Sequence, residues 1–381
     1  MEQLSILDFM PEDEAKKYKP IKSTDWKWTF ADYPKEKNGL KVFSCFACGG
    51  GSTMGYKLAG CEVLGCCEID PKMNEIYVKN HNPKYNFLMD IREFNKIPDE
   101  ELPKELFNLD ILDGSPPCTT FSMAGDREKS WGKKKKFREG QAEQTLDDLS
   151  FVFIETAKKL KPKTVVMENV EGLLKGNAWS YVQRIYKEFG DAGYNLKHWL
   201  LKGEQMGVPQ TRHRVFFVAI RKDIEFDFDK LDMNFNYELI LFGDVRSGIG
   251  NDVSLTVEKM LNIATKSDKC LGDILKRTQN RWSRFNEKIV WDEQICPTVQ
   301  SHGMYAASTK KRLSKMDYIH AQTFPEDYYV PNDSVSLISY ICGMSVPPVM
   351  IKRIVTRIIE SGLYDKRRTK QTNDARRSSL L

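Results

Sequence analysis

The sequence predicts an α/β fold, in which a mostly parallel sheet is covered by helices on both faces and carries a smaller second lobe. Three observations support this prediction. Short apolar runs of strand length alternate with helix-length stretches from Leu40 onward. Each of these runs ends in an acidic residue or in a Gly/Pro turn, which is typical of strands that stop at a sheet edge. The alternation then stops after Arg221, where the chain becomes irregular and rich in aromatic residues.

The expected elements follow in chain order. Strands are predicted at Lys41–Phe46, Glu62–Cys67, Asn86–Met89, Leu109–Leu112, Thr164–Met167 and Arg214–Ile220. Helices are predicted from the glycine turn to Gly60, after the N-cap and first-turn proline of Asp70-Pro71, and at Leu146–Leu160 and Ala178–Phe189. A last helix begins at Pro347-Pro348. Its apolar stripe predicts burial in the core for Ile351, Ile354, Val355, Ile358 and Ile359.

Four parts of the chain are predicted. Residues 1–40 form an N-terminal extension, in which Trp26 and Trp28 are expected to dock on the rest of the protein. Residues 41–221 form the main domain, which a C-terminal helix within residues 341–362 completes. Residues 222–340 form the smaller lobe, and residues 363–381 form a basic tail.

The composition excludes several classes of protein. The chain has 381 residues, of which 41% are hydrophobic and 29% charged, as in folded globular proteins. No apolar run reaches about 18 residues, and Met1–Met10 lacks a basic start, so neither a membrane span nor a secretory signal is expected. The nine cysteines, an odd number, are expected to be reduced in a cytoplasmic protein. Five histidines and a single Cys45-x-x-Cys48 pair predict no metal site.

A glycine turn, Gly49-Gly50-Gly51, follows the first predicted strand. The dinucleotide pattern GxGxxG fails because Met54 occupies its third glycine position. The phosphate-binding loop pattern fails as well, since Tyr56 stands where its lysine would be. By itself the turn is explained equally well as a tight structural turn or as a ligand site.

Two acidic residues follow the next strands. Glu68 ends the second strand, where a carboxylate commonly accepts hydrogen bonds from ribose hydroxyls. Asp90 ends the third, where it could meet an adenine amino group. Either residue alone is explained equally well as an N-cap or a solvated turn residue. Together with the glycine turn they favour a nucleoside without a pyrophosphate, a description that S-adenosylmethionine fits.

Four further residues are candidates for catalysis. Cys118 follows Pro116-Pro117 directly after a strand, which separates it from the other cysteines, whose simplest role is packing in the core. Glu168 is delivered to the same sheet edge by a later strand. Arg212 and Arg214 stand at alternate positions of another strand, so both guanidinium groups are expected to face one site.

These motifs together resemble the bacterial and phage DNA cytosine-5 methyltransferases, and they run in that family's order over roughly Val42–Ile359. The resemblance implies the Rossmann-like fold of S-adenosylmethionine-dependent methyltransferases with a target-recognition domain at 222–340. The motifs that carry it are the glycine turn, Glu68, Asp90, Pro117-Cys118 with Phe121-Ser122, Glu168-Asn169-Val170, Gln210-x-Arg212-x-Arg214, Arg312-Leu313-Ser314, Gln322-x-Phe324-Pro325 and Gly343-x-Ser345-Val346-Pro347-Pro348.

The resemblance assigns a catalytic role to each candidate. Carbon-5 of cytosine becomes nucleophilic once a thiolate adds to carbon-6, and the family position makes Cys118 that nucleophile. Glu168 would hydrogen-bond or protonate ring nitrogen 3. Arg214 would hold the base's carbonyl oxygen or a phosphate, and Arg212 would order the site electrostatically.

Cofactor contacts are implied in the same way. S-adenosylmethionine is the expected cofactor, and its implied contacts are Phe46, Gly50, Gly51, Glu68, Ile69, Asp90, Ile91, Pro117 and Ser345. Two residues depart from the family pattern: Cys48 replaces a glycine and Met344 an asparagine. We expect both to be tolerated, with weaker cofactor binding.

The implied substrate is double-stranded DNA, from which the target base is extruded into the pocket. Residues 126–139, with seven basic and three acidic side chains, match the family's mobile loop. The expected DNA contacts are Ser122, Lys133, Lys134, Lys135, Arg277, Arg281 and Arg284. A cognate restriction endonuclease is a further expected partner, in the bacterial cytoplasm, while the recognised sequence has no transferable code.

Two other functions compete with this one. The same chemistry on transfer RNA is the nearest alternative, but Phe121-Ser122 follows the DNA enzymes rather than the Phe-Thr of the RNA relative. A non-enzymatic DNA-binding protein on a degenerate scaffold is the other, and the presence of Cys118, Glu168 and Arg214 argues against it. An enzyme that uses NAD or ATP is a distant third, because both phosphate patterns fail.

Overall fold

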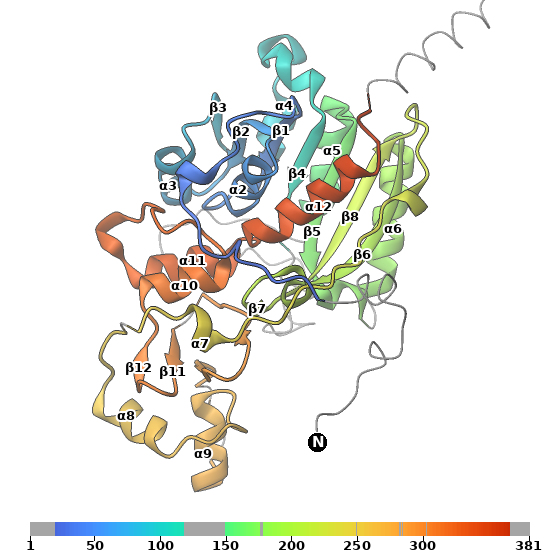
Figure 1. Cartoon of the computed structure of the whole chain (residues 1–381). Coiled ribbons are helices and arrows are strands. Elements are labelled where there is room, and N and C mark those ends of the chain that lie inside the picture. The colour runs from blue at the N-terminus through green and yellow to red at the C-terminus, as the bar shows by residue number, and fades with distance from the viewer. Residues whose placement is uncertain are drawn as a thin grey trace, which may run out of the picture.

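The computed structural model describes residues 20–117, 149–175, 178–248, 250–281, 283, 285–301 and 303–365. Figure 1 shows a large body built around a central sheet, with a smaller lobe that carries helices α8 and α9. The sheet has seven strands in the order β3-β2-β1-β4-β5-β8-β6. These strands are β1 (Lys41–Cys45), β2 (Glu62–Glu68), β3 (Tyr85–Leu88), β4 (Ile111–Gly114), β5 (Thr164–Val170), β6 (Tyr194–Lys202) and β8 (His213–Arg221).

The strands from β3 to β5 pair in parallel, while β8 runs antiparallel to both β5 and β6. The predicted mostly parallel α/β fold is therefore confirmed. Strand β6 is absent from the sequence-based prediction. It lies at the edge of the sheet, where Lys197 and His198 interrupt its apolar pattern and leave only part of it buried. Strand β5 extends beyond its predicted end, because Glu168 and Asn169 continue to pair with β8.

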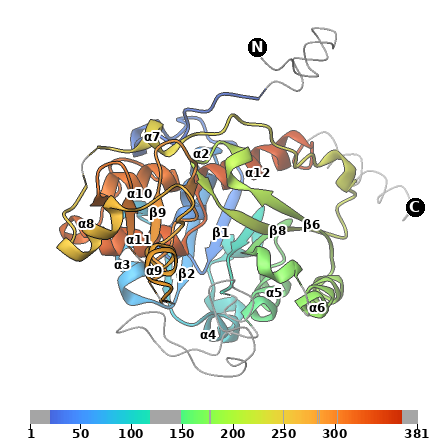
Figure 2. The same ribbon diagram turned by 90° about the horizontal axis from the view of Figure 1, so that it is seen from below.

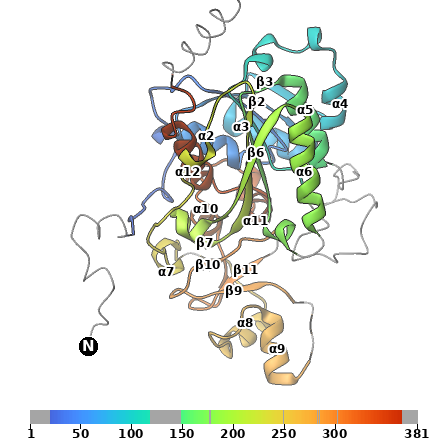
Figure 3. The same cartoon turned by 90° about the vertical axis from the view of Figure 1, so that its right-hand side faces the viewer.

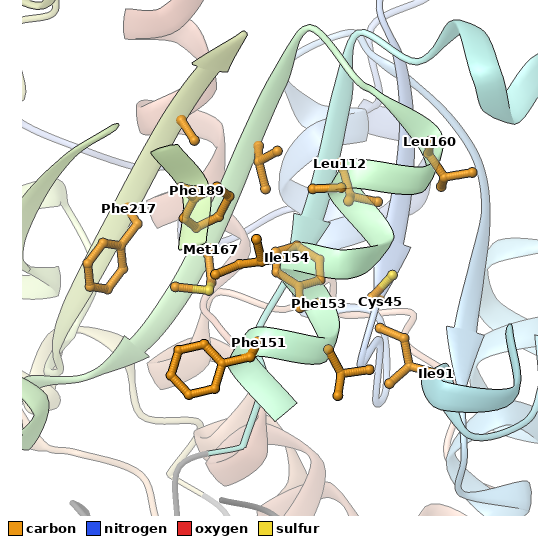
Figure 4. Close-up of a cluster of buried hydrophobic side chains, with 14 of the residues drawn as sticks. Cys45, Ile91, Leu112, Phe151, Phe153, Ile154, Leu160, Met167, Phe189 and Phe217 are labelled. Carbon is orange, nitrogen blue, oxygen red and sulfur yellow. The ribbon is translucent and has the colours of Figure 1, made fainter. Parts of the chain in front are cut away.

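Helices cover both faces of the sheet, as Figure 3 shows from the side. One face packs against α2 (Gly51–Leu58) and α12 (Pro348–Glu360). The other packs against α4 (Ile91–Lys96), α5 (Leu149–Leu160) and α6 (Trp179–Asp191). Figure 4 shows the second of these cores, in which Phe153 and Ile154 of α5 meet Leu112 of β4. Helix α3 (Pro71–His81) starts at the predicted Asp70 cap, whose carboxylate accepts from two backbone N–H groups.

The apolar stripe of α12 is in the core, as predicted. Ile351, Ile354, Val355 and Ile358 are buried, and Ile359 is partly buried against the same cluster. Among the described residues, Val335–Glu360 is the one helical stretch that is long and apolar enough to cross a membrane, and 67% of its apolar 18-residue segment is buried inside the protein. This stretch contains two core helices, α11 and α12, which Ser345, Val346 and Pro347 separate.

The segment after β8 divides between the two bodies. The lobe contains α7 (Phe242–Val245), α8 (Leu255–Asn262), α9 (Leu271–Gln279), β9 (Lys288–Val290), β11 (Met304–Ala306) and β12 (Lys311–Arg312). Strand β10 (Cys296–Pro297) pairs with β7 (Gln210–Thr211) of the large body. Helices α10 (Lys315–Gln322) and α11 (Val335–Met344) share an apolar cluster with Met54 of α2 and Ile76 of α3. Figure 2 shows these helices grouped with the lobe on one side of the molecule, away from α6.

The division at 222–340 stays a prediction, since residues of this segment pack on both bodies. Single-turn 3-10 helices occur at Phe30–Asp32, Asp99–Glu101, Lys104–Asn108, Glu171–Leu174, Gly203–Met206, Phe228–Lys230 and Pro331–Asp333.

The N-terminal segment packs against the end of α10 and against α12. Trp28 is buried, and its indole N–H donates to the carbonyl of Thr323, 2.9 Å away. Asp25 forms ion pairs with Lys352 and Arg353 of α12. Residues 20–40 are therefore part of the packed structure.

Candidate active site

The glycine turn connects β1 to α2 through unusual backbone angles. Phe46 and Cys48 have φ values of 57° and 46°, and Gly50 has a φ of 87°. A Cβ on Gly50 would lie 2.0 Å from Nε2 of His81, and one on Gly51 would lie 2.3 Å from the carbonyl oxygen of Val346. Packing alone therefore requires glycine at these two positions. The turn is a structural junction as well as a candidate ligand site.

Glu68 braces this turn from the end of β2. Its side chain is 7% exposed, Oε2 accepts from the N–H of Cys48 at 2.7 Å, and Oε1 accepts from the N–H of Asp70 at 2.8 Å. Burial raises the pKa of Glu68, and these backbone hydrogen bonds oppose that shift. Three backbone N–H groups, of Cys48, Ile69 and Asp70, use three of the four lone-pair sites of the carboxylate, which leaves one for a ribose hydroxyl. The predicted ribose contact is compatible with this geometry and stays a prediction, as does that of the adjacent Ile69.

Asp90 lies at the same sheet edge, because β3 pairs in parallel with β2. Its carboxylate caps α4 by accepting from the N–H of Arg92 at 2.8 Å, and it forms an ion pair with the Arg92 guanidinium at 3.2 Å. The N-cap alternative is what the structure shows for this residue. A contact of Asp90, or of the buried Ile91 beside it, with adenine stays a prediction.

Ser345 faces the glycine turn from the end of α11. It is 4% exposed, and a Cβ on Gly51 would lie 2.8 Å from its Cβ. Its hydroxyl lies beside the Cys48 thiol and has no hydrogen-bond partner of normal geometry among the described residues. Burial raises the pKa of that thiol to about 12, so Cys48 is uncharged. A buried hydroxyl without a partner, next to Glu68 and a tight turn, fits a polar ligand such as S-adenosylmethionine.

Glu168 and Arg214 form an ion pair where β5 and β8 meet. Arg214 Nε lies 2.8 Å from Glu168 Oε1, and both side chains are mostly buried. The guanidinium also donates from Nη1 to the carbonyl of His213 at 2.8 Å. Burial lowers the pKa of Arg214, and the charge of Glu168 opposes that shift. The pair can thus present a carboxyl group and a guanidinium to one planar ring.

Arg212 is placed differently from Arg214. It is 2% exposed, and its guanidinium donates to the carbonyls of Gly343 at 3.0 Å and Val299 at 3.4 Å. Its Nε has no partner among the described residues. Burial lowers the pKa of Arg212, the positive charge of Arg214 lowers it further, and the charge of Glu168 opposes this shift. The charge of Arg214 acts on Arg212, but Arg212 lies between β7 and β8 rather than in one strand with Arg214, so the expected shared strand is wrong. Arg212 joins distant backbone segments whereas Arg214 holds Glu168, and a common site for both guanidinium groups stays a prediction.

Gln210 was part of the predicted motif without a role of its own. It is fully buried, donates from Nε2 to the carbonyl of Ala321 at 2.7 Å, and accepts at Oε1 from the N–H of Val299 at 3.1 Å. It therefore connects β7 to α10 and to the chain leaving β10. The only sequence signal for this role was its spacing from Arg212 and Arg214.

Asp113 on β4 was missed by the sequence analysis. It is 3% exposed, accepts at Oδ2 from Ser44 Oγ at 2.7 Å, and accepts at Oδ1 from the Tyr56 hydroxyl at 3.1 Å. Burial raises its pKa to about 7. An acidic residue inside an otherwise apolar strand was the signal that could have identified it.

Several predicted residues lie outside the described part of the chain. These are Cys118, Ser122, Lys133, Lys134, Lys135 and Arg284. Pro117 is the last described residue before Cys118, and Asn169 Nδ2 lies 3.5 Å from the carbonyl oxygen of Pro116. The segment that leads to Cys118 therefore runs beside the residue that follows Glu168. The described residues contain no group of three or more His, Cys, Asp or Glu placed to hold a metal.

Two of the residues that are predicted to contact DNA, Arg277 and Arg281, lie in the described part of the lobe. Arg277 pairs with Asp268 at 2.7 Å and donates to the carbonyl of Ile263 at 2.7 Å, so it holds α9 against the end of α8. This ion pair lowers the pKa of Asp268. Arg281 follows α9 and is exposed. Arg281 could contact a phosphate without breaking an ion pair to any of the described residues. Arg277 would have to bind the phosphate while it also binds Asp268.

The chain is similar to known proteins over most of its length. Residues 40–360 match the family described as C-5 cytosine-specific DNA methylase. The type II methyltransferase M.FnuDI of Fusobacterium nucleatum is 37% identical over 185 residues, which are 49% of this chain and 48% of that protein. M.NgoPII of Neisseria gonorrhoeae is 32% identical over 51% of this chain and 52% of its own length. These two matches thus span about half of each relative.

Longer matches are weaker in identity. The type II methyltransferase M.Bsp6I of Bacillus sp. (strain RFL6) is 25% identical over 85% of this chain and 100% of its own length. Among solved structures, a mutant of Spodoptera frugiperda DNMT2 aligns with a TM-score of 0.58 at 17% identity, covering 84% of this chain and 100% of that one. Entamoeba histolytica EhMeth aligns with a TM-score of 0.55 at 14% identity, covering 86% and 99%. These two structures support the fold alone.

Proposed function

Since the chain belongs to the C-5 cytosine-specific DNA methylase family, we propose that it transfers a methyl group from S-adenosylmethionine to carbon-5 of a cytosine in double-stranded DNA. The observation that carries this proposal is the buried ion pair of Glu168 and Arg214, 2.8 Å apart, beside the Pro116-Pro117 segment that leads to Cys118. The glycine turn with Glu68 and Ser345 supplies polar groups for a cofactor at the same sheet edge.

Each of these residues has a chemical task. The Cys118 thiolate forms a bond to carbon-6, and the displaced electron density moves to ring nitrogen 3, which Glu168 hydrogen-bonds or protonates. Carbon-5 is then nucleophilic, and bound S-adenosylmethionine supplies an electrophilic methyl group. Removal of the carbon-5 proton re-forms the double bond and expels the Cys118 thiolate. Arg214 holds Glu168 in place and hydrogen-bonds the base's carbonyl oxygen.

In this proposal, residues from strand ends and from helix termini hold the cofactor. Glu68 accepts from the ribose hydroxyls, Asp90 from the adenine amino group, and the Ser345 hydroxyl contacts the polar end of the cofactor. The remaining proposed contacts are Phe46, Gly50, Gly51, Ile69, Ile91 and Pro117.

The DNA is proposed to lie between the large body and the lobe, with the target base extruded toward Glu168. The seven basic residues of 126–139 and the exposed Arg281 would contact phosphates. The names of M.FnuDI and M.Bsp6I describe type II methyltransferases. We therefore propose that this enzyme methylates one duplex sequence in the bacterial cytoplasm, alongside a restriction endonuclease that cuts the same sequence.

The test offers tritiated S-adenosylmethionine with duplex DNA and, separately, with transfer RNA. Label is expected in the DNA alone, and bisulfite sequencing of DNA from expressing cells is expected to show methylated cytosines in one sequence context. Label that enters only RNA would defeat the proposed substrate.

A covalent trap tests the chemistry. A duplex that carries 5-fluorocytosine at the target position is expected to remain bound to the wild-type enzyme, because fluorine cannot leave as a proton does. Cys118→Ala is expected to abolish both the trapped complex and methyl transfer while S-adenosylmethionine still binds. Undiminished turnover in this variant would remove Cys118 from its role.

A further inference from the structure

Asp113 is a buried acid that the proposed chemistry does not use. Its carboxylate accepts from Ser44 and Tyr56, and the ion pairs of the described residues include none at this position. Taking a carboxylate out of water without a cation partner is costly. Buried acids with a perturbed pKa cluster at functional sites.

Asp113 shares a face of the sheet with the catalytic pair. Ser44 lies opposite Asp113 in the β1–β4 pairing, and Asp113 lies opposite Val166 in the β4–β5 pairing. Glu168 comes two residues after Val166, and alternate residues of a strand point to the same face. Asp113 and Glu168 therefore share the face on which α2 and α12 pack, and the charge of Glu168 acts on Asp113. On this face Asp113 lies on β4, between Ser44 of β1 and the β5 residues that lead to Glu168.

The charged and titratable neighbours of Asp113 come from every element around it. Burial raises its pKa to about 7 and the charge of Glu168 adds to that shift, whereas hydrogen bonds from Ser44, Tyr56 and Ser52 oppose it. Cys45 of β1, Tyr56 of α2 and Tyr77 of α3 also interact with Asp113, and burial raises the pKa of each well above its ordinary value. Unlike these three side chains, Asp113 changes its charge near neutral pH.

The methyl group fixes where the donor sulfur must lie. During transfer the methyl group stands between that sulfur and carbon-5 of the base, which is the base that Glu168 contacts. The sulfur of S-adenosylmethionine carries a positive charge, and the sulfur of the product S-adenosylhomocysteine is neutral. We propose that ionised Asp113 is the countercharge through which this site prefers the charged donor to its neutral product. This inference rests on the proposed function, and Coulomb attraction in a buried site of low dielectric constant supplies its physical basis.

The same residue lowers the stability of the free protein at high pH. The carboxyl of Asp113 loses its proton near its ordinary value of 3.8 when unfolded, but at about 7 when folded. Between these pH values the folded state holds the additional proton, so the stability from this residue falls as pH rises through 7. Asp113→Asn carries no charge to bury, so its melting temperature is expected to exceed that of the wild type above this pH.

The test is calorimetric titration of the full chain with S-adenosylmethionine and with S-adenosylhomocysteine at about pH 6 and about pH 8.5. Asp113→Asn keeps groups that hydrogen-bond the hydroxyls of Ser44 and Tyr56 but removes the charge. Asp110→Asn is the matched control: Asp110 is also buried, begins the same strand segment, and accepts from Lys41 and Lys163 far from the site.

In the wild type and in Asp110→Asn, the preference for the donor over the product is expected to rise about threefold to tenfold between the two pH values. In Asp113→Asn the rise is expected to be lost. Because all variants meet the same ligands, the titration of the ligands' own groups cancels in this comparison.

Four outcomes decide the inference. Three results overturn the inference: an equal rise in Asp113→Asn, a preference in the wild type that does not change with pH, and an equal loss of affinity for both ligands in folded Asp113→Asn. In each of these cases, methyl transfer by the wild type still supports the proposed function. Wild-type protein that binds neither ligand overturns both. If Asp113→Asn does not fold, Tyr56→Phe replaces it: this variant removes a hydrogen bond that lowers the pKa of Asp113, so the rise must move to higher pH.

Discussion

Glu68 and Glu168 are both acids at the carboxyl end of one sheet, but their partners lie at different distances along the chain. Glu68 on β2 accepts from backbone N–H groups 20 and 2 residues away. Glu168 on β5 is held by Arg214 from an antiparallel strand. Beside it, Arg212 reaches carbonyls 87 and 131 residues away. Glu68 at the cofactor end is thus held by near neighbours, although Ser345 reaches the glycine turn from α11, and Glu168 and Arg212 at the catalytic end are held by segments from across the chain.

Substitutions at these two acids are expected to differ in how far their effects extend. A change at Glu68 alters a few hydrogen bonds within one turn and is expected to affect ligand affinity. A change at the catalytic end is expected to alter either the chemistry or the packing of the lobe on the large body, depending on which arginine or acid it removes.

The largest expected effect is on turnover at the catalytic end. Glu168→Gln retains a side chain beside Arg214 but cannot donate a proton to ring nitrogen 3. We expect kcat to fall by about 10²–10⁴-fold, while S-adenosylmethionine affinity changes by less than about threefold. Tritium transfer and calorimetry measure the two quantities.

Glu171→Gln is the control for this variant, because Glu171 also lies near β8 and forms an ion pair with Lys175 at 2.8 Å. A comparable fall of kcat in this control would mean that Glu168 acts through general electrostatics.

The second prediction concerns the stability of the catalytic end. Arg212→Ala leaves the carbonyls of Val299 and Gly343 without donors and opens a cavity, so the free energy of unfolding is expected to fall by about 3 kcal/mol. Urea unfolding measures it, and Arg212→Lys, which keeps the charge, should lose less. An alanine variant that is as stable as the wild type but inactive would place the guanidinium at the substrate instead.

At the cofactor end, Glu68→Gln replaces an acceptor oxygen by an amide that repels the N–H of Cys48 or Asp70. The dissociation constant for S-adenosylmethionine is expected to increase about tenfold, without loss of the overall fold. Glu62→Gln, at the exposed start of the same strand, is the control and should bind normally. Equal affinity in both variants would exclude Glu68 from the cofactor site.

The smallest effect is expected at Asp90. Asparagine caps a helix as well as aspartate does, so Asp90→Asn should leave the melting temperature almost unchanged. The loss of a charged acceptor for the adenine amino group is expected to weaken S-adenosylmethionine binding about threefold. Unchanged affinity in calorimetry would leave Asp90 with its capping role alone.

Most of the fold could be predicted from the sequence, and less of the site. The parallel strands follow from short apolar runs, and the α12 stripe follows from helical spacing. Strand β6 escaped prediction because one edge of it meets solvent, so its residues carry mixed polarity. The different tasks of Arg212 and Arg214 also escaped, because alternate spacing names no partner and because Arg212 lies between β7 and β8 rather than in the strand of Arg214.

The strand–helix alternation, the glycine turn, the acids that end the strands and the family of the chain all follow from the amino-acid sequence. These features depend on residues a few positions apart, where backbone geometry and capping decide the outcome. The antiparallel direction of β8 against β5, the link that Arg212 makes between Val299 and Gly343, and the face of the sheet that Asp113 shares with Glu168 follow only from the packing of the whole chain. Burial is the reason: a side chain loses water to segments far along the chain, and only their packing determines which groups replace that water.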